Sequence, residues 1–290
     1  MSRPPWSTDH FWHPDRARAA IRDRFPAVAC DTVEALGEGW DSQAFRVDGT
    51  WVFRFPKRDD VVPHLRQEIA VLPRLSLPIR KPEFAWIGEP GGDVPVPFVG
   101  YRQIPGTPLG ELPLDALDVP AVLHNLLDAL DAIHATPLTG PVAAVQGWAP
   151  GPPVVASLDE AGLSSEPLVQ WAVTRLRDPG PERVLLHDDT GPEHVLMQDG
   201  APIGLIDWGD LGVGDPARDL VGLLAWSGVE PLREALDRTG ADPALLDRAI
   251  GRRVYYALGA WRDGLRFDRA DMVQTSVGVL SRLREELGER

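Results

Sequence analysis

The chain of 290 residues contains 43 acidic and 29 basic residues, which gives a formal net charge of -14 at pH 7. This charge disfavours DNA or RNA as a partner, because phosphate neutralisation needs clustered lysine and arginine, and it suits a cationic small molecule. The single cysteine, Cys30, excludes an internal disulfide, and no apolar run has the length of a membrane span. Since the first residues also lack the apolar core of a signal peptide, we expect a cytoplasmic protein with no membrane partner.

The clearest strand signals follow a stretch at residues 7–25 that ends in a helical pattern. Strands are predicted at residues 32–36, 43–47 and 50–55. The turn between the first two contains Gly37, Gly39 and Ser42. Such a turn can fold its backbone N–H groups over phosphates, although an ordinary loop can have the same composition.

The third predicted strand carries a cation, Arg54. With the period of 2 of a strand, Trp51, Phe53 and Phe55 share one face, and Val52 and Arg54 share the other. The aromatic face is therefore expected to enter the core, and Arg54 is expected to face a different element of the fold.

A helix predicted at residues 63–72 carries a carboxylate beside its apolar stripe. Glu68 lies one helical turn from members of that stripe, which are Leu65, Ile69 and Leu72. A buried carboxylate needs a cation, and Arg54 is the nearest candidate. The alternative is a boundary glutamate whose carboxylate reaches water.

Further strands are predicted at residues 84–87 and 98–104, where Pro105-Gly106 ends the second of them. Beyond this break the pattern is mostly helical. Helices are predicted at residues 119–135, 158–177, 215–226, 231–238, 243–266 and 269–287.

Residues 184–220 interrupt the helices with two acidic loops joined by a hairpin. Asp189 lies in the first loop, the pair Asp199-Gly200 predicts the turn, and Asp207 follows the second strand. Such a hairpin brings Asp189 and Asp207 near each other at one edge. Phosphoryl transfer needs two carboxylates in this arrangement, one to orient the attacking hydroxyl and one to hold the magnesium ion that bridges the phosphates. The alternative is an acidic surface hairpin that only caps a core.

Three motifs in this region carry a resemblance to a known family. They are His187-x-Asp189-x-x-x-x-His194, Ile206-Asp207-Trp208-Gly209-Asp210 and Gly214-Asp215-Pro216-x-x-Asp219-Leu220. Their order resembles that of the aminoglycoside phosphotransferase family, a branch of the protein-kinase-like fold. Residues 36–57 look closest to the aminoglycoside 2″-phosphotransferases, and the macrolide phosphotransferases come next.

The resemblance implies an α+β, bilobal protein-kinase-like fold. An antiparallel-sheet lobe with one main helix is expected at residues 1–104, and a larger, mostly helical lobe is expected at residues 105–290, after a hinge at residues 102–105. The residues expected to bind ATP or GTP are Gly37, Gly39, Ser42, Arg54, Glu68, Gln103 and Ile104, with Lys57 as a second candidate cation for the phosphates.

The resemblance also implies that Asp189 is the catalytic residue and that Asp207 and His194 hold Mg²⁺. The sequence departs from most relatives, which have lysine in place of Arg54, asparagine in place of His194 and glycine in place of Asp188. Because imidazole is a poor magnesium ligand, His194 is also a candidate hydrogen-bond partner of Asp189. Three other motif residues are expected to brace the loop or cap a helix, namely His187, Asp215 and Asp219.

The acceptor is expected to be a small, hydroxylated and cationic molecule. In the enzymes that this chain resembles, acidic residues after the metal-binding loop bind amine groups, whereas the corresponding segment here is mostly apolar, which would suit a macrolide better. The residues expected to contact the substrate are Asp210, Glu230, Glu234, Tyr256, Trp261 and Asp263.

Taken with the resemblance, the motifs predict transfer of the γ-phosphate of ATP or GTP to a hydroxyl of an aminoglycoside antibiotic, with Mg²⁺, by a monomer or homodimer. The alternatives within this chemistry are a macrolide 2′-phosphotransferase and a small-metabolite kinase. An alternative of another class is a non-catalytic kinase-like protein that binds nucleotide or drug.

Overall fold

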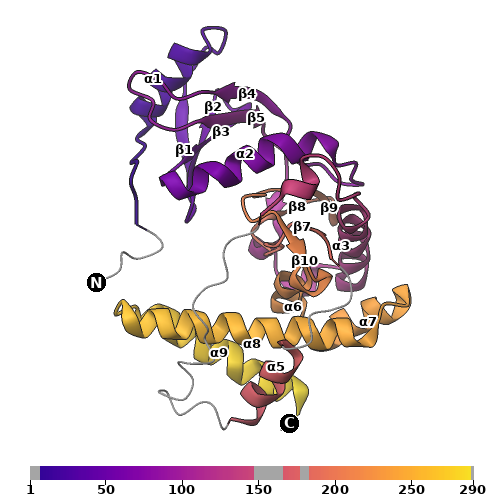
Figure 1. Ribbon diagram of the computed structural model, residues 1–290. Helices are drawn as coiled ribbons and strands as arrows, with labels where there is room; N and C mark the ends of the chain where they lie inside the picture. Colours follow the sequence, from indigo (N-terminus) through magenta and orange to yellow (C-terminus); the bar gives the residue numbers. More distant parts are fainter. Residues whose placement is uncertain (1–6, 147–165, 177–182, 289–290) are drawn as a thin grey trace. The chain divides into compact units, whose positions relative to one another are not determined.

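The structure, a computed structural model, describes residues 7–146, 166–176 and 183–288. The chain forms two compact units (Figure 1). The N-terminal unit comprises Met1–Leu75, Arg80–Pro105 and Gly204–Gly209, and the C-terminal unit comprises Ser76–Ile79, Gly106–Ile203 and Asp210–Arg290. The N-terminal unit therefore includes a short segment from the second half of the chain, and this segment contains Asp207.

The N-terminal unit is built around a five-stranded antiparallel sheet with the order β1-β2-β3-β5-β4. Its strands are β1 (Val33–Glu38), β2 (Ser42–Val47), β3 (Trp51–Pro56), β4 (Phe84–Gly88) and β5 (Phe98–Arg102). Its helices are α1 (Pro14–Arg24), the short 3-10 helices η1 (Asp59–Val61) and η2 (Leu72–Arg74), and α2 (Val62–Val71).

The two faces of β3 carry the side chains that the period of 2 predicted. Phe53 and Phe55 are fully buried in a core that also contains Phe98 and residues of α1, and the rings of Phe55 and Phe98 stack at 4.5 Å. Arg54 faces the other way and meets Glu68 of α2. Figure 1 shows α1 and α2 on opposite sides of the sheet. The strand thus separates an aromatic core from a buried ion pair.

The turn between β1 and β2 is tighter than the sequence predicted. Gly37 pairs with Ala44, and Ser42 pairs with Pro56, so both residues belong to strands and only residues 39–41 lie between them. The register shifts between Ala35 and Gly37, and this irregularity lets β1 continue to Glu38.

The C-terminal unit is mostly helical. Its short strands are β6 (Thr107–Pro108), β7 (Val184–Leu186), β8 (Val195–Gln198), β9 (Ala201–Leu205) and β10 (Gly212–Gly214), and they form two small sheets with the orders β6-β8-β9 and β10-β7. The last residues of β9 lie in the segment that belongs to the N-terminal unit. Its α-helices are α3 (Val119–His134), α5 (Pro167–Leu176), α6 (Leu220–Ser227), α7 (Val229–Thr239), α8 (Pro243–Arg266) and α9 (Ala270–Leu287).

The helices of this unit bury the apolar stripes that the sequence predicted. The stripe of α3 is buried throughout, and its members are Val122, Leu123, Leu126, Leu127, Leu130 and Ile133. The long helix α8 packs against α5, α6 and α9 (Figure 1). Helix α8 therefore lies at the centre of the unit and presents side chains to several neighbours.

Two helix predictions differ from the structure. The helix predicted at residues 158–177 is present as α5, and residues 158–165 and 177 lie outside the described residues. The helix predicted at residues 215–226 is instead a 3-10 helix, η6 (Pro216–Arg218), followed by α6. Asp219 lies at the junction, where its backbone ends the first helix and begins the second.

Among the residues that the structure describes, no helix combines the length and the apolar character that crossing a membrane requires.

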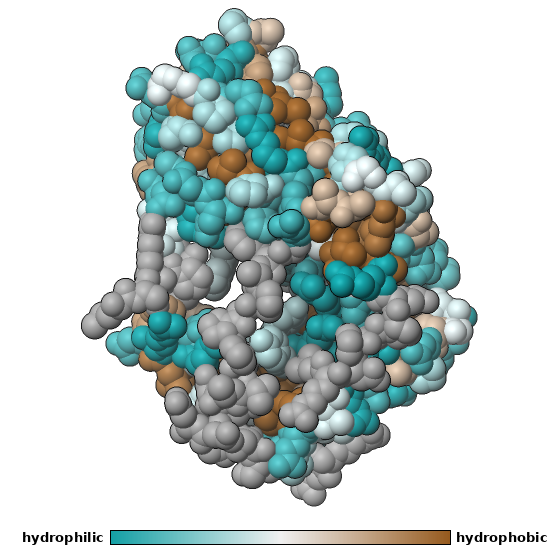
Figure 2. Space-filling view, viewed as in Figure 1, coloured by the Kyte–Doolittle hydropathy of each residue, from teal (hydrophilic) through white to brown (hydrophobic). Residues whose placement is uncertain are grey.

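On the face shown in Figure 2, the surface of the N-terminal unit is mostly hydrophilic, with hydrophobic residues in small groups between polar ones. This distribution agrees with the burial of the aromatic face of β3.

Candidate functional site

The residues that the sequence singled out lie in two groups, one in each unit. In the N-terminal unit the central contact is the ion pair of Arg54 and Glu68. The Arg54 Nη1 donates to Glu68 Oε2 at 2.9 Å, and Nη2 donates to Oε1 at 2.8 Å. Both side chains are buried, with 9% of Arg54 and 1% of Glu68 exposed. The predicted pairing of Glu68 with Arg54 is confirmed.

Asp207 joins this pair from the loop after β9. Its Oδ1 lies 3.7 Å from Arg54 Nη2, and its side chain is half exposed. Its backbone is left-handed, with φ of 61°, and the next residue, Trp208, is fully buried and donates its Nε1–H to the Leu205 carbonyl. Burial opposes the charge of Arg54, but the carboxylates of Glu68 and Asp207 outweigh it and raise the pKa of Arg54.

The turn at residues 39–41 is closed by a hydrogen bond from the Gly39 N–H to the Ser42 carbonyl at 3.1 Å. Neither Gly37 nor Gly39 has a positive φ, so neither glycine is required by the backbone conformation. A Cβ atom at Gly37 would meet no atom within 4 Å. The space beside Gly37 is therefore open, and a ligand could approach the backbone there.

The segment after β5 was expected to bind the purine through backbone groups of Gln103 and Ile104. The Gln103 N–H already donates to the Thr50 carbonyl at 2.9 Å, as an extension of the sheet. Within the described residues, the Ile104 N–H has no hydrogen-bond acceptor. The groups left for a purine are therefore the Gln103 carbonyl and the Ile104 N–H.

In the C-terminal unit, Asp189 lies in the loop after β7 and its side chain is 43% exposed. His194 Nδ1 lies 3.0 Å from the Asp189 carbonyl oxygen and 3.4 Å from its Oδ2. Because a carbonyl oxygen only accepts, Nδ1 carries the hydrogen and donates it. The Asp189 N–H in turn donates to Nδ1 of the buried His187 at 3.2 Å. Two histidines thus hold the backbone on both sides of Asp189.

Asp219, at the start of α6, holds the same loop and is fully buried. Its Oδ1 accepts the Asp188 N–H at 2.6 Å, and its Oδ2 accepts the His187 N–H at 3.2 Å. Its Oδ2 also lies 2.8 Å from His134 Nε2, and its carbonyl accepts the Thr190 hydroxyl. The prediction that Asp219 braces this loop is confirmed.

Asp215 has the predicted capping role, and it also pairs with arginines of α8. It accepts the Ala217 N–H at 3.1 Å, and its other oxygen accepts from Arg248 and Arg252, each at 3.1 Å. Burial raises the pKa of Asp215, but these hydrogen bonds dominate and hold it below its ordinary value.

Asp188, at a position where the resemblance led us to expect glycine, is a buried acid that is only partly hydrogen-bonded. Its side chain is 5% exposed and forms an ion pair with Arg218. Its Oδ1 has no hydrogen-bond partner within the described residues. Burial raises the pKa of Asp188 to about 7, although Arg218 acts in the opposite direction. The backbone at this position is left-handed, with φ of 69°, a conformation that glycine adopts more readily than aspartate.

A cavity of about 370 Å³ opens beside Asp189 within the C-terminal unit. Its walls carry acidic side chains, basic side chains and an aromatic ring. The residues that supply these groups are Asp188, Asp189, Glu193, Arg218, Arg253 and Tyr256. Of these residues, Tyr256 was expected to contact the substrate, whereas Arg218 and Arg253 were not predicted. Arg218 lies within the Asp215–Asp219 motif and could have been noticed there, whereas Arg253 follows no motif in the helix α8.

The other residues that were expected to bind substrate do not line this cavity. Glu230 and Glu234 are exposed on α7 and pair with Arg233 and Arg238. The remaining three lie outside the lining of the cavity: Asp210, Trp261 and Asp263, the last of which pairs with Arg262. Within the described part of the chain, no group of three or more histidine, cysteine or acidic side chains is arranged to hold a metal ion.

Comparison with known proteins identifies a matching family and several similar structures. A family model described as the phosphotransferase enzyme family matches residues 32–256. The GDP complex of the wild-type aminoglycoside 2'-phosphotransferase-IIIa is 26% identical, with a TM-score of 0.76 over 93% of this chain and 98% of that one. The GDP and kanamycin complex of APH(2")-IIia is 27% identical, with a TM-score of 0.74 over the same shares, 93% and 98%.

A macrolide 2'-phosphotransferase, MphH from Brachybacterium faecium, has a similar fold at 22% identity, with a TM-score of 0.62 over 90% of this chain and 97% of that one. No curated protein sequence matches the chain.

Proposed function

Because the chain belongs to the phosphotransferase enzyme family, we propose that it transfers the γ-phosphate of ATP or GTP to a hydroxyl group of an aminoglycoside, with Mg²⁺. Its kinase-like fold and its class, a phosphotransferase with an alcohol group as acceptor, follow from the family and from the structures it resembles. The observation that carries the proposal is the position of Asp189, which lines a cavity and is fixed through its backbone by His187 and His194.

In this proposal Asp189 accepts a hydrogen bond from the acceptor hydroxyl and orients it toward the γ-phosphate. The carboxylate needs only its ordinary ionised form at neutral pH, so positioning supplies most of the rate enhancement. His194 supports it by fixing the Asp189 backbone, and its Nδ1 lies close enough to Oδ2 to limit the side-chain orientation.

The nucleotide would bind the N-terminal group of residues. The open space beside Gly37 would let phosphates approach the backbone of the turn at residues 39–41. Glu68 takes one donor from each terminal nitrogen of Arg54, and the remaining N–H groups of the planar guanidinium suit phosphate oxygens. Gly37, Ser42, the Gln103 carbonyl and the Ile104 N–H complete the proposed nucleotide site.

Asp207 fits the proposed magnesium ion better than His194 does. Its half-exposed carboxylate offers the oxygen ligands that a hard cation prefers. His194 directs a protonated Nδ1 at Asp189, and imidazole nitrogen suits softer metals. When bound, the magnesium ion would neutralise charge on the phosphates, and Asp207 would hold it there.

The aminoglycoside is favoured as acceptor because the kanamycin complex is among the similar structures at 27% identity. The cavity favours a second candidate, a small metabolite that carries a carboxylate or phosphate as well as a hydroxyl. Arg253 lines the cavity and has no ion pair within the described residues, whereas its neighbours Arg248 and Arg252 both pair with Asp215. Burial and the nearby Arg282 lower the pKa of Arg253, so an anion there would relieve an unfavourable charge.

The proposal is tested by nucleotide consumption with purified protein, ATP or GTP, and Mg²⁺, across aminoglycosides, macrolides, amino alcohols and hydroxy acids. Turnover with kanamycin-type compounds supports the aminoglycoside. Turnover confined to hydroxy acids, with an acceptor KM that rises when Arg253→Ala is introduced, supports the metabolite. A protein that binds nucleotide but consumes none with any acceptor contradicts both.

A further inference from the structure

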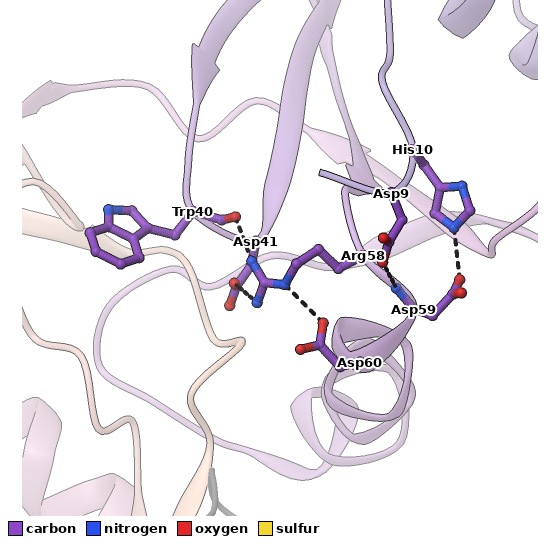
Figure 3. Close-up of polar contacts among 7 residues, drawn as sticks. All are labelled: Asp9, His10, Trp40, Asp41, Arg58, Asp59 and Asp60. Atoms are coloured by element: carbon purple, nitrogen blue, oxygen red, sulfur yellow. Dashed lines mark hydrogen bonds and ion pairs between the residues drawn. The ribbon is translucent and has the colours of Figure 1, made fainter. Parts of the chain in front are cut away.

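Arg58 binds two segments of the N-terminal unit through its guanidinium group, the turn at residues 39–41 and η1 (Figure 3). It lies between β3 and η1, and only 9% of its side chain is exposed. The Nη1 donates to the Trp40 carbonyl at 2.9 Å, and Nη2 donates to Asp41 Oδ1 at 2.7 Å. The Nε donates to Asp60 Oδ1 at 2.9 Å. Each nitrogen of the side chain thus has a separate acceptor.

Two of these acceptors belong to the turn at residues 39–41, which is proposed to lie against the phosphates. The neighbouring Lys57 reinforces the contact, because its Nζ donates to the Gly39 carbonyl at 3.1 Å and its N–H donates to the Asp41 carbonyl at 2.8 Å. All three carbonyl groups of the turn therefore accept hydrogen bonds from the segment that follows β3. Lys57 holds the turn and is itself buried.

The N-terminal segment holds Lys57 in place. The N–H groups of Asp9 and His10 both donate to the Lys57 carbonyl at 2.8 Å, and His10 Nε2 lies 2.7 Å from Asp59 Oδ1 (Figure 3). Trp12 is buried and donates its Nε1–H to the Pro56 carbonyl at 3.0 Å. Residues 56–59 are thus bound on one side by the N-terminal segment, and they bind the turn on the other.

The charge of Arg58 is maintained by its partners. Burial opposes the charged form, but Asp41 and Asp60 outweigh it and raise the pKa of Arg58. Charge-assisted hydrogen bonds to a nearly buried guanidinium are strong, and they lose more than neutral ones when a partner is removed. The turn is consequently fixed before any ligand arrives, which lowers the entropy cost of binding.

Arg58 also connects the turn to the helix that carries Glu68. Asp60 belongs to η1, which runs directly into α2. A displacement of the turn would therefore pull on the start of α2 through Arg58 and Asp60. Glu68 on this helix positions Arg54, the cation proposed for the phosphates. The turn and Arg54 are therefore both held by contacts to η1 and α2.

We propose that Arg58 is a positioning residue for the nucleotide, which fixes the turn at residues 39–41 from behind and couples it to α2. This inference rests on the proposed function, because it takes the turn to be a phosphate-binding element. It differs from a general stabilising role, since it predicts an effect on nucleotide affinity that the acceptor does not share.

The test compares Arg58→Ala and Arg58→Lys with the wild type. Calorimetric titration with ATP and GTP gives the nucleotide Kd, and steady-state kinetics give the two KM values. The matched control is Arg46→Ala, which breaks an exposed ion pair with Glu34 in the adjacent β1-β2 hairpin. We expect Arg58→Ala to raise the nucleotide Kd about tenfold and to change the acceptor KM less than about twofold. Arg58→Lys should have a smaller effect in the same direction, and Arg46→Ala should have none.

A nucleotide Kd that is unchanged in Arg58→Ala overturns the inference, and so does an equal rise in both KM values. If Arg58→Ala does not fold, Asp41→Asn replaces it, because it weakens one contact of the turn and keeps the shape of the side chain. A wild-type protein that binds neither ATP nor GTP contradicts the proposed function itself, and the two failures are therefore distinguishable.

Discussion

Each unit of the molecule contains a buried carboxylate that is paired with an arginine, and the two pairs differ in how completely their hydrogen bonds are satisfied. In the N-terminal unit, Arg54 and Glu68 bond through two nitrogens and both oxygens. In the C-terminal unit, Asp188 bonds to Arg218 through one oxygen, and neither its Oδ1 nor the Arg218 Nε has a hydrogen-bond partner within the described residues.

The two pairs therefore differ in how firmly they hold their side chains and their charges. A bidentate pair fixes both side chains and keeps Arg54 charged, although burial raises the pKa of Glu68 against the effect of Arg54. A fixed cation of this kind suits the binding of a polyphosphate. A half-satisfied pair leaves its carboxyl with a pKa of about 7, so its charge changes with small changes of pH. Asp188 adjoins Asp189, and the charge beside the proposed catalytic carboxylate therefore changes near neutral pH.

Removal of a partner from the better-satisfied pair is expected to have the largest effect. Glu68→Ala would leave Arg54 as a buried cation without its main partner, and we expect a loss of about 3–5 kcal/mol in the free energy of unfolding. Glu34→Ala is the matched control, because it breaks an exposed pair with Arg46 and should cost less than about 1 kcal/mol. Urea unfolding of both variants measures the difference. Equal losses in the two variants would show that the buried pair is not special.

A smaller effect is expected where the loop of Asp189 packs against α6. A Cβ atom at Gly222 would lie 2.2 Å from the Thr190 carbonyl oxygen, so Gly222→Ala must displace the loop that Asp219 also holds. We expect the free energy of unfolding to fall by about 1–3 kcal/mol, which lowers the melting temperature, and we expect a lower kcat. Gly278→Ala in α9 is the control, because a Cβ there meets nothing within 4 Å and alanine favours a helix. A kcat that is unchanged in Gly222→Ala would contradict the role of this contact in seating the loop.

A third effect is a pH dependence specific to Asp188. Its pKa is about 7 in the folded chain and near 3.8 in the unfolded chain, so the folded state binds more protons between these values. The free energy of unfolding must then fall as the pH rises through this window, and the Asp188 contribution becomes constant above about pH 7. In Asp188→Asn this contribution is absent. Between pH 5 and pH 8 the melting temperature of the wild type should therefore fall more than that of Asp188→Asn. An equal fall in the two proteins would contradict the shifted pKa.

Local pattern was sufficient to predict much of the N-terminal unit. The period of 2 in β3 and the apolar stripe of α2 together predicted that Arg54 and Glu68 meet, because each element exposes one face to the other. The helical character of the C-terminal unit was also predicted from helical periods, whereas the antiparallel sheet and the bracing role of Asp219 were expected from the resemblance to the family.

The contacts that the sequence missed join charges far apart in the chain. Arg218 pairs with Asp188, and Arg58 binds the turn before β2, but neither contact leaves a period or a spacing that local analysis can detect. The extent of the turn was missed because a bulge continues β1 past Gly37. Glu230 was chosen for its charge and its place after the metal-binding motif, whereas the cavity that would select substrate residues exists only once α8 has packed.

The most direct test of the account is the effect of Asp189→Asn on turnover and on nucleotide binding, measured with the acceptor that the substrate panel identifies. Asparagine keeps the size of the side chain but removes the carboxylate that is proposed to orient the hydroxyl. We predict that kcat falls about 10²- to 10⁴-fold while the Kd for ATP or GTP stays within about twofold of the wild type. Turnover that survives the substitution would contradict the assignment of Asp189, and with it the account of the cavity as the site of phosphoryl transfer.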